Sequence, residues 1–170
     1  MSGAQPVTGS VLVISGPNLN LLGERQPEVY GRSTLDDHVR AATAAGERLG
    51  LRVEHRCSNA EGELIEAVHA ARGRYDALVV NAGALSHTSW SLHDALATFA
   101  GVVIEVHLSN PAGREPFRHR SVLAPVASGS IAGFGGLGYE LAIEAVARLL
   151  GQGGTGEAEQ AGVPATPVDR

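Results

Sequence analysis

The 170-residue sequence contains no lysine, because all 13 of its basic residues are arginine. This excludes a mechanism through a lysine Schiff base, and it excludes a Walker-type phosphate loop, which needs a lysine. Cys57 is the only cysteine, so neither a disulfide framework nor a multi-cysteine metal site can form within the chain. No two histidines have the spacing of a zinc-binding helix, so we expect no metal.

An excess of positive charge is also missing, since the net charge is −5. A basic face for nucleic acid is therefore not expected. No apolar run approaches the length of a membrane span. The first ten residues lack the basic start of a signal peptide, and the apolar run after them is short. These features predict a cytoplasmic protein that binds neither nucleic acid nor a membrane.

Short β-branched runs alternate with helical patterns along the chain. Strands are predicted at 11–15, 51–57, 77–81 and 102–107, with a weaker one at 126–132, and helices after Ser33-Thr34 and at 61–72, 90–100 and 139–150. This order predicts an α/β fold, a flavodoxin-like doubly wound five-stranded parallel sheet in three layers, α/β/α. We expect a flexible N-terminus at 1–9, a single domain at 10–150, and a disordered tail at 151–170, which is rich in Gly and polar residues.

The first predicted strand runs into a long loop, residues 15–31, with the sequence SGPNLNLLGERQPEVYG. It is too rich in Gly, Pro and Asn to predict a helix, and it carries Arg25 and Tyr30. A free tyrosine has a pKa of about 10 and is a poor base at neutral pH, but a nearby guanidinium favours its phenolate. The pair is therefore a candidate proton acceptor. The alternative is a packed tyrosine ring and an exposed arginine.

Other polar residues follow the ends of later strands, where doubly wound sheets bind ligands. His107 ends the fourth strand, although a lone histidine there is as often structural. Three loops are expected to bring one group of side chains to a common edge: Asn18, Arg25, Tyr30, Asn81, His87, His107, Arg114 and Arg118. Such cationic and hydrogen-bonding groups suit a small anionic, hydroxylated ligand.

The remaining sequence patterns do not indicate a cofactor or a further site. The glycines of 133–138 match GxGxxG, but they precede the last helix and no strand follows, so we expect a close-packed turn and no dinucleotide. The SGPN segment is not a phosphate loop for FMN, and we expect no cofactor. The remaining histidines are expected to be solvated or structural: His38, His55, His69, His93 and His119.

Taken together, five segments carry a family resemblance. They are GPNLNLLGERQPEVYG, NAGALSHTS, EVHLSN, REPFRHRS and GFGGLGY, in this order within residues 11–150. With them the chain resembles the type II 3-dehydroquinate dehydratases of the shikimate and quinate pathways. The resemblance implies conversion of 3-dehydroquinate to 3-dehydroshikimate and water through an enolate, without metal, nucleotide or imine.

The resemblance also implies roles for individual residues. Tyr30 stands at the proton acceptor, Arg25 at the residue that activates it, His107 at the proton donor, and Asn18 at the position that stabilises the enolate through a water. The substrate-binding positions are Asn81 and the backbone amides of Leu108 and Ser109 for the carboxylate, His87, Arg114 and Arg118 around the hydroxyls, and Asp94, which reaches a neighbouring subunit's site. The implied assembly is a homododecamer, a tetramer of trimers.

The sequence departs locally from the family pattern. Ser15 stands where an asparagine is usual, 111–113 replaces a stretch that often carries an apolar residue and a histidine, and Trp90 and His93 are bulkier than expected. The alternative function is a sheet that binds a small hydroxy acid without turnover. Retention of both a base and an acid argues against a binder. Whether the role is biosynthetic or catabolic remains open.

Overall fold

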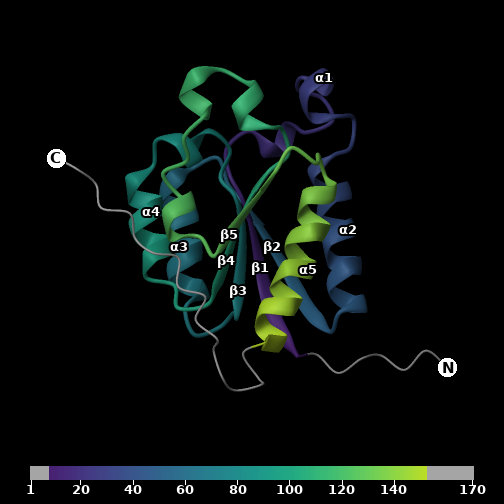
Figure 1. The fold of residues 1–170 in the computed structure, drawn as a ribbon, viewed down its shortest axis with the longest axis vertical. Helices are drawn as coiled ribbons and strands as arrows, with labels where there is room; N and C mark the ends of the chain where they lie inside the picture. The colour runs from purple at the N-terminus through teal and green to yellow at the C-terminus, as the bar shows by residue number, and fades with distance from the viewer. Residues whose placement is uncertain (1–7, 153–170) are drawn as a thin grey trace.

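In a computed structural model of the chain, the structure describes residues 8–152. They form a three-layered α/β domain in which α2 and α5 cover one face of a central sheet and α3 and α4 cover the other (Figure 1). The strands are β1 (Gly9–Ser15), β2 (Leu51–Cys57), β3 (Ala77–Asn81), β4 (Val102–His107) and β5 (Gly129–Ala132). The helices are α1 (Pro27–Tyr30), α2 (Leu35–Arg48), α3 (Glu61–Ala71), α4 (Trp90–Ala97) and α5 (Leu137–Gln152).

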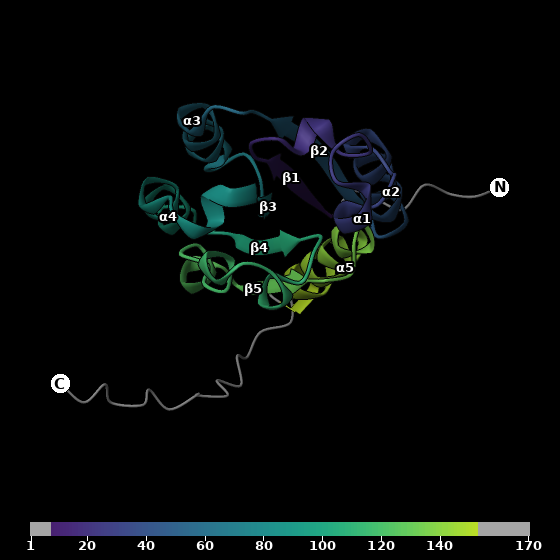
Figure 2. The ribbon, with the colours of Figure 1, turned by 90° about the horizontal axis from the view of Figure 1, so that it is seen from above.

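All five strands are parallel, in the order β2-β1-β3-β4-β5, which is the flavodoxin-like order. The predicted fold class is therefore confirmed. The chain reverses its direction of progress between β1 and β3, and their carboxyl ends lie under the same rim of loops (Figure 2). Ligands of such sheets bind at this switch point.

Alternating side chains divide the core between the two faces of the sheet. Val11 and Val13 of β1 face α2 and α5, whereas Leu12 and Ile14 face α3 and α4. The helices begin where capping groups satisfy their first amides. Thr34 and Asp37 form a reciprocal capping box at the start of α2, as the sequence predicts.

The remaining boundaries differ from the predictions in a few places. β5 begins at Gly129 because Ala124–Val126 forms a 3-10 turn, and α4 ends at Ala97. The prediction that 15–31 contains no helix is wrong, since Pro27–Tyr30 forms one helical turn after Gln26. α5 includes 151 and 152, the first two residues of the predicted tail. The other tail residues, and 1–7 of the predicted flexible N-terminus, lie outside the described residues.

The glycines of 133–138 form the predicted turn between β5 and α5. Gly133 and Gly135 have positive φ angles of 91° and 57°, which favour glycine. Gly136 lies so close to the His38 ring that a Cβ would meet its Nδ1 at 2.1 Å. This turn therefore needs glycine for backbone conformation and for close packing. No helix within residues 8–152 has both the length and the apolar character to span a membrane.

Candidate active site

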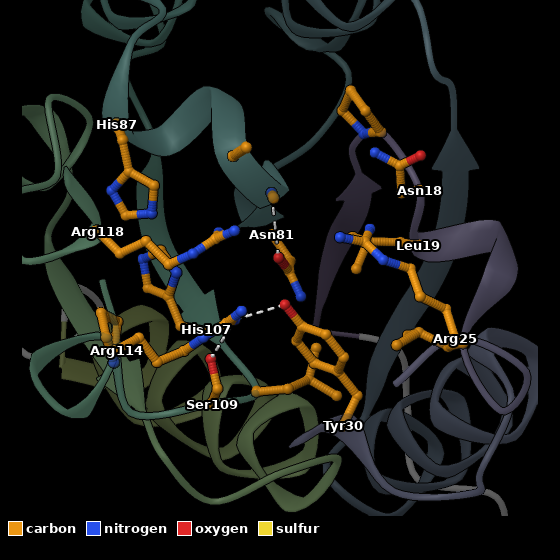
Figure 3. A pocket seen from close by; sticks show the side chains of 16 residues that line it. Asn18, Leu19, Arg25, Tyr30, Asn81, His87, His107, Ser109, Arg114 and Arg118 are labelled. Carbon is orange, nitrogen blue, oxygen red and sulfur yellow. Dashed lines mark hydrogen bonds between the residues drawn. The ribbon is translucent and has the colours of Figure 1, made fainter. Parts of the chain in front are cut away.

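A cleft at the carboxyl ends of the strands gathers ten of the eleven predicted site residues (Figure 3). The lid segment between β1 and α2 forms one wall, and the loops after β3 and β4 form the other. The ten are Asn18, Arg25, Tyr30, Asn81, His87, His107, Leu108, Ser109, Arg114 and Arg118. Asp94 is the exception, because it lies exposed on α4 and does not line the cleft.

The Tyr30 hydroxyl is held by an arginine other than the predicted one. Arg114 donates a hydrogen bond from Nη1 to the Tyr30 oxygen at 2.5 Å, and its Cζ lies 5.2 Å from the centre of the Tyr30 ring. The same nitrogen lies 3.3 Å from the Ser109 hydroxyl oxygen. A guanidinium on a phenolic oxygen favours the negatively charged form of the phenol. The loop after β4 therefore supplies the charge that contacts the lid tyrosine.

Arg25 points into the same cleft from the lid (Figure 3). Within residues 8–152 no hydrogen bond joins it to Tyr30. Arg25 precedes α1 and Tyr30 ends it, so the helical turn separates the two side chains along the lid. Arg25 is thus placed to contact a ligand, and the predicted direct pairing with Tyr30 is absent from this arrangement.

Glu115 orients both arginines of the loop after β4. Its Oε2 accepts a hydrogen bond from Nε of Arg118 at 2.9 Å and lies 3.5 Å from Nε of Arg114. Its own backbone amide, and then Arg118 and Arg114, hold the pKa of the Glu115 carboxyl below its ordinary value. The motif REPFR therefore contains an acidic residue that sequence reasoning did not include in the site.

His107 is paired with a buried carboxylate. Its Nε2 lies 3.0 Å from Oε1 of Glu105, which is 2% exposed and also accepts hydrogen bonds from Ser121 and Ser130. Burial raises the pKa of Glu105, but the bonds from His107 and the two serines outweigh it and hold the pKa below 4.5. Glu105 is therefore ionised at neutral pH. The missed signal is a glutamate inside the apolar run VVIEVH, since a charge is rarely buried without a partner.

His87 is held in one tautomer on the same wall of the cleft as His107 (Figure 3). Its Nδ1 lies 2.8 Å from the carbonyl oxygen of Arg120, and a carbonyl only accepts, so Nδ1 carries the proton. Its ring stacks on that of His107 with centroids 6.0 Å apart. With Nδ1 engaged by the carbonyl, Nε2 is the ring nitrogen that faces a ligand hydroxyl.

Two asparagines stand on either side of the switch point. Asn18, with a left-handed φ of 68°, donates its backbone N–H to Oδ1 of Asn59 at 2.8 Å. Asn81 ends β3, is 3% exposed, and donates from Nδ2 to the Tyr139 hydroxyl at 3.1 Å. Asn59 and Tyr139, which hold these two residues, were not among the predicted site residues. Their role depends on strand pairing, which local sequence does not display.

The cleft is lined mainly by arginine, histidine and amide groups, which suit an anionic ligand better than a metal ion. Among residues 8–152, no group of three or more His, Cys, Asp or Glu side chains is placed to hold a metal ion. The cleft can accept a carboxylate and hydroxyl groups, and it contains one phenol held by a guanidinium and one imidazole held by a carboxylate. Such an arrangement can remove one proton and donate another.

Comparison with known proteins gives a consistent result. A family model described as "Dehydroquinase class II" matches residues 9–147. The chain is 54% identical over 143 residues to the 3-dehydroquinate dehydratase of Hyphomonas neptunium, covering 84% of this chain and 95% of that one. It is 51% identical over 138 residues to 3-dehydroquinate dehydratase 2 of Pseudomonas aeruginosa, covering 81% and 93%. The crystal structure of the type II dehydroquinase from Propionibacterium acnes superposes with a TM-score of 0.81 at 40% identity, covering 85% and 99%.

Proposed function

The chain belongs to the class II dehydroquinase family and dehydrates 3-dehydroquinate in the shikimate pathway, and we propose that Tyr30 and His107 carry its two proton transfers. In the substrate, C2 lies between the C3 ketone and the C1 hydroxyl, so loss of a C2 proton gives an enolate. Collapse of the enolate expels the C1 hydroxyl, which leaves as water once it is protonated. The observation that carries the proposal is the presence, in one cleft, of a phenol on a guanidinium and an imidazole on a buried carboxylate.

Tyr30 as phenolate takes the C2 proton. Its oxygen lies 2.5 Å from Nη1 of Arg114, and that cation stabilises the phenolate before the substrate arrives. Arg25 lines the cleft beside it and stabilises negative charge that develops on the substrate. The two arginines thus have separate tasks, one on the base and one on the substrate.

The enolate oxygen is stabilised by Asn18, acting through a water. Support comes from the fixed backbone of Asn18, which Asn59 holds in its left-handed conformation. A donor that is already oriented lowers the barrier without reorganising during the reaction. Asn59 acts here through Asn18 and does not line the cleft.

His107 protonates the departing hydroxyl. Because Nε2 is engaged by Glu105, Nδ1 is the ring nitrogen available to the substrate. The ionised Glu105 stabilises the positive charge that the imidazole carries while it acts as an acid. After turnover, Tyr30 holds the C2 proton and His107 lacks one, so exchange with solvent restores both groups.

The substrate's carboxylate is placed against Asn81 and the backbone amides of Leu108 and Ser109, just past the end of β4. His87, Arg114 and Arg118 surround its hydroxyls. We further propose a cytoplasmic homododecamer, a tetramer of trimers, in which Asp94 reaches a neighbouring subunit's cleft. Its exposed position on α4 supports this role, because Asp94 does not line the cleft of its own chain. The proposed reaction requires no cofactor.

The direct test follows the conjugated enone of 3-dehydroshikimate by its absorbance. The purified parent should form it from 3-dehydroquinate, and Tyr30→Phe should lower kcat by about a hundredfold or more, because the general base is lost. The matched control is Tyr75→Phe, since Tyr75 lies outside the cleft and its hydroxyl is bonded to Glu54. That variant should keep the parental rate.

Three outcomes would contradict the proposal. A Tyr30→Phe enzyme with the parental kcat would remove Tyr30 as the base. Inactivation by borohydride in the presence of substrate would point to an imine intermediate, for which this sequence offers no lysine. Substrate binding without enone formation would instead support a binder.

A further inference from the structure

Four polar side chains form a line that leads from the cleft across the sheet, on the face covered by α2 and α5. β2, β1 and β3 each contribute one: His55, Ser15 and Asn81. In the parallel registers Val13 pairs with His55, and Ser15 pairs with Asn81, so alternation turns all three polar side chains to the same face. Tyr139 of α5 completes the line.

The four residues are joined by hydrogen bonds in a buried environment. His55 Nε2 lies 2.9 Å from the Ser15 hydroxyl, and Asn81 Nδ2 lies 3.1 Å from the Tyr139 hydroxyl. Burial raises the pKa of Tyr139, and hydrogen bonds with Ser15 and Asn81 partly offset that effect. Ser15 and Tyr139 are 0% exposed. Buried polar groups of this kind are costly unless every one of them is paired.

The Asn81 amide fits its neighbours in only one orientation. Gly83 donates its backbone N–H to Oδ1 of Asn81 at 3.3 Å, so the amide oxygen faces that loop and Nδ2 faces Tyr139. The Tyr139 oxygen accepts a hydrogen bond from Nδ2 of Asn81. Its hydrogen bond with Ser15 lowers the pKa of Tyr139, which is the effect of a donor to that oxygen. Ser15 in turn lies against Nε2 of His55, whose pKa is lowered by burial more than the Asp36 carboxylate raises it. The orientation of the amide leaves the second Nδ2 hydrogen of Asn81 for the cleft.

The ring of Tyr139 is fixed as firmly as its hydroxyl. The His38 ring stacks against it with centroids 5.8 Å apart and an interplanar angle of 20°. On the other side of His38, the absence of a side chain at Gly136 allows the close approach described above. The stacked ring therefore keeps the Tyr139 oxygen in place even if the Asn81 amide rotates.

We propose that Ser15, His55 and Tyr139 are positioning residues that hold the Asn81 carboxamide with its N–H toward the substrate's carboxylate. The inference rests on the proposed role of Asn81 in binding that carboxylate. An amide turned by 180° would present its oxygen to the carboxylate and repel it. A turned amide would set its NH2 group against the Gly83 N–H, which needs an acceptor, and would take the Nδ2 donor away from the Tyr139 oxygen. Ser15, paired with His55, holds the Tyr139 hydroxyl in place from the other side.

The test is the effect of substitutions on KM and kcat in the enone assay. Tyr139→Phe and His55→Leu should each raise KM about fivefold and leave kcat within about twofold, because they disturb binding and leave the proton-transfer groups intact. His55→Gln should restore most of the loss, since its amide can hydrogen-bond to the Ser15 hydroxyl. Tyr75→Phe is the matched control and should leave KM unchanged. In an Asn81→Ala background, Tyr139→Phe should raise KM no further.

The possible failures are distinguishable. If Asn81→Ala leaves KM unchanged, the proposed role of Asn81 is wrong. If Asn81→Ala raises KM but neither Tyr139→Phe nor His55→Leu does, the positioning role is wrong. An equal rise of KM in the parental and Asn81→Ala backgrounds would also overturn it, because the effect would not pass through Asn81. Should Tyr139→Phe fail to fold, the His55→Leu and His55→Gln pair, at the partly exposed end of the line, decides the question.

Discussion

Two arginines line the cleft with the lid tyrosine and come from different parts of the chain. Arg114 contacts the Tyr30 oxygen directly across 84 positions of sequence, whereas Arg25, five residues away, lines the cleft without that bond. A pair of residues close in sequence suggests a local contact, but the helical turn of α1 intervenes between these two. The partner of the Tyr30 hydroxyl is therefore determined by the meeting of two loops, which spacing along the chain does not reveal.

The division of labour between the two arginines predicts different pH–rate profiles. In Arg114→Gln the phenolate loses its contacting cation, so the ascending limb of kcat/KM should move to higher pH. A tenfold loss of phenolate below the limb corresponds to about 1.4 kcal/mol. In Arg25→Gln the rate should fall with a smaller displacement of the limb. Both profiles are measured with the enone assay from acid to alkaline pH.

The exposed Arg72 on the far side of the domain provides the control, and Arg72→Gln should reproduce the parental profile. A larger displacement in Arg25→Gln than in Arg114→Gln would show that Arg25 is the cation that serves the base. An unshifted limb in both variants would mean that neither arginine favours the phenolate of Tyr30.

At the scale of elements, the buried strands were predicted most accurately. β2, β3 and β4 begin and end at the predicted residues because each is a short apolar or β-branched run bounded by turn residues. The one-turn helix α1 was missed because PEVY has no apolar period, although Pro27 at its start and Gly31 after its end are helix-boundary signals. Such a short element depends on its neighbours more than on its own sequence.

The site was predictable to the extent that its residues follow strand ends. Parallel strands share one carboxyl edge, so Asn81 and His107 could be brought together from sequence alone. Their partners were missed for different reasons. Glu105 lies two residues before His107 on β4, and strand alternation together with its charge in an apolar run could have identified it. Tyr139 contacts Asn81 only because helix packing brings a distant segment to the sheet, on which local patterns carry no information.

The spacing of two residues on β4 makes a prediction for Glu105. Glu105 and His107 face the same side of the sheet, and the carboxylate stabilises the charged imidazole. Glu105→Gln should therefore lower kcat about tenfold or more. The exposed Glu144 is the control, and Glu144→Gln should keep the parental kcat. An unchanged kcat in Glu105→Gln would show that His107 works without its carboxylate.

The same residue affects acid stability. The pKa of Glu105 is lower in the folded chain than its ordinary 4.5, so its contribution to stability is present above that value and is lost as the pH falls. Between about pH 6 and about pH 4, the urea midpoint should therefore fall less in Glu105→Gln than in the parent. Equal falls would mean that Glu105 does not contribute to acid sensitivity.

At the scale of the whole molecule, the strand order determines where the cleft opens. Asn18 follows β1 and Asn81 ends β3, so the two asparagines flank the point at which the chain changes direction across the sheet. The lid segment and the loop after β4 form opposite walls of the cleft at this point. One domain therefore supplies every proposed site residue except Asp94.

The proposed assembly needs an exposed face on each chain, and helix α4 presents one. Trp90 is 57% exposed, and Asp94 lies four residues later, on the same side of the helix. Large exposed aromatic side chains beside polar groups are common at protein interfaces. An assembly that covers Trp90 would also carry Asp94 toward a neighbouring chain. The proposed dodecamer would have a mass of about 210 kDa, from twelve chains of 17.5 kDa.

Mixed assemblies test whether Asp94 serves a neighbouring cleft. Tyr30→Phe and Asp94→Ala should each be impaired as pure assemblies of parental mass. When the two are coexpressed, a cleft is complete if its own chain has Tyr30 and the neighbouring chain has Asp94, which random mixing gives in about a quarter of the clefts. The mixture should therefore be more active than the average of the two pure variants, with its mass measured by light scattering. Activity equal to that average would place Asp94 outside the neighbouring site, and a fully active monomer would exclude a shared site altogether.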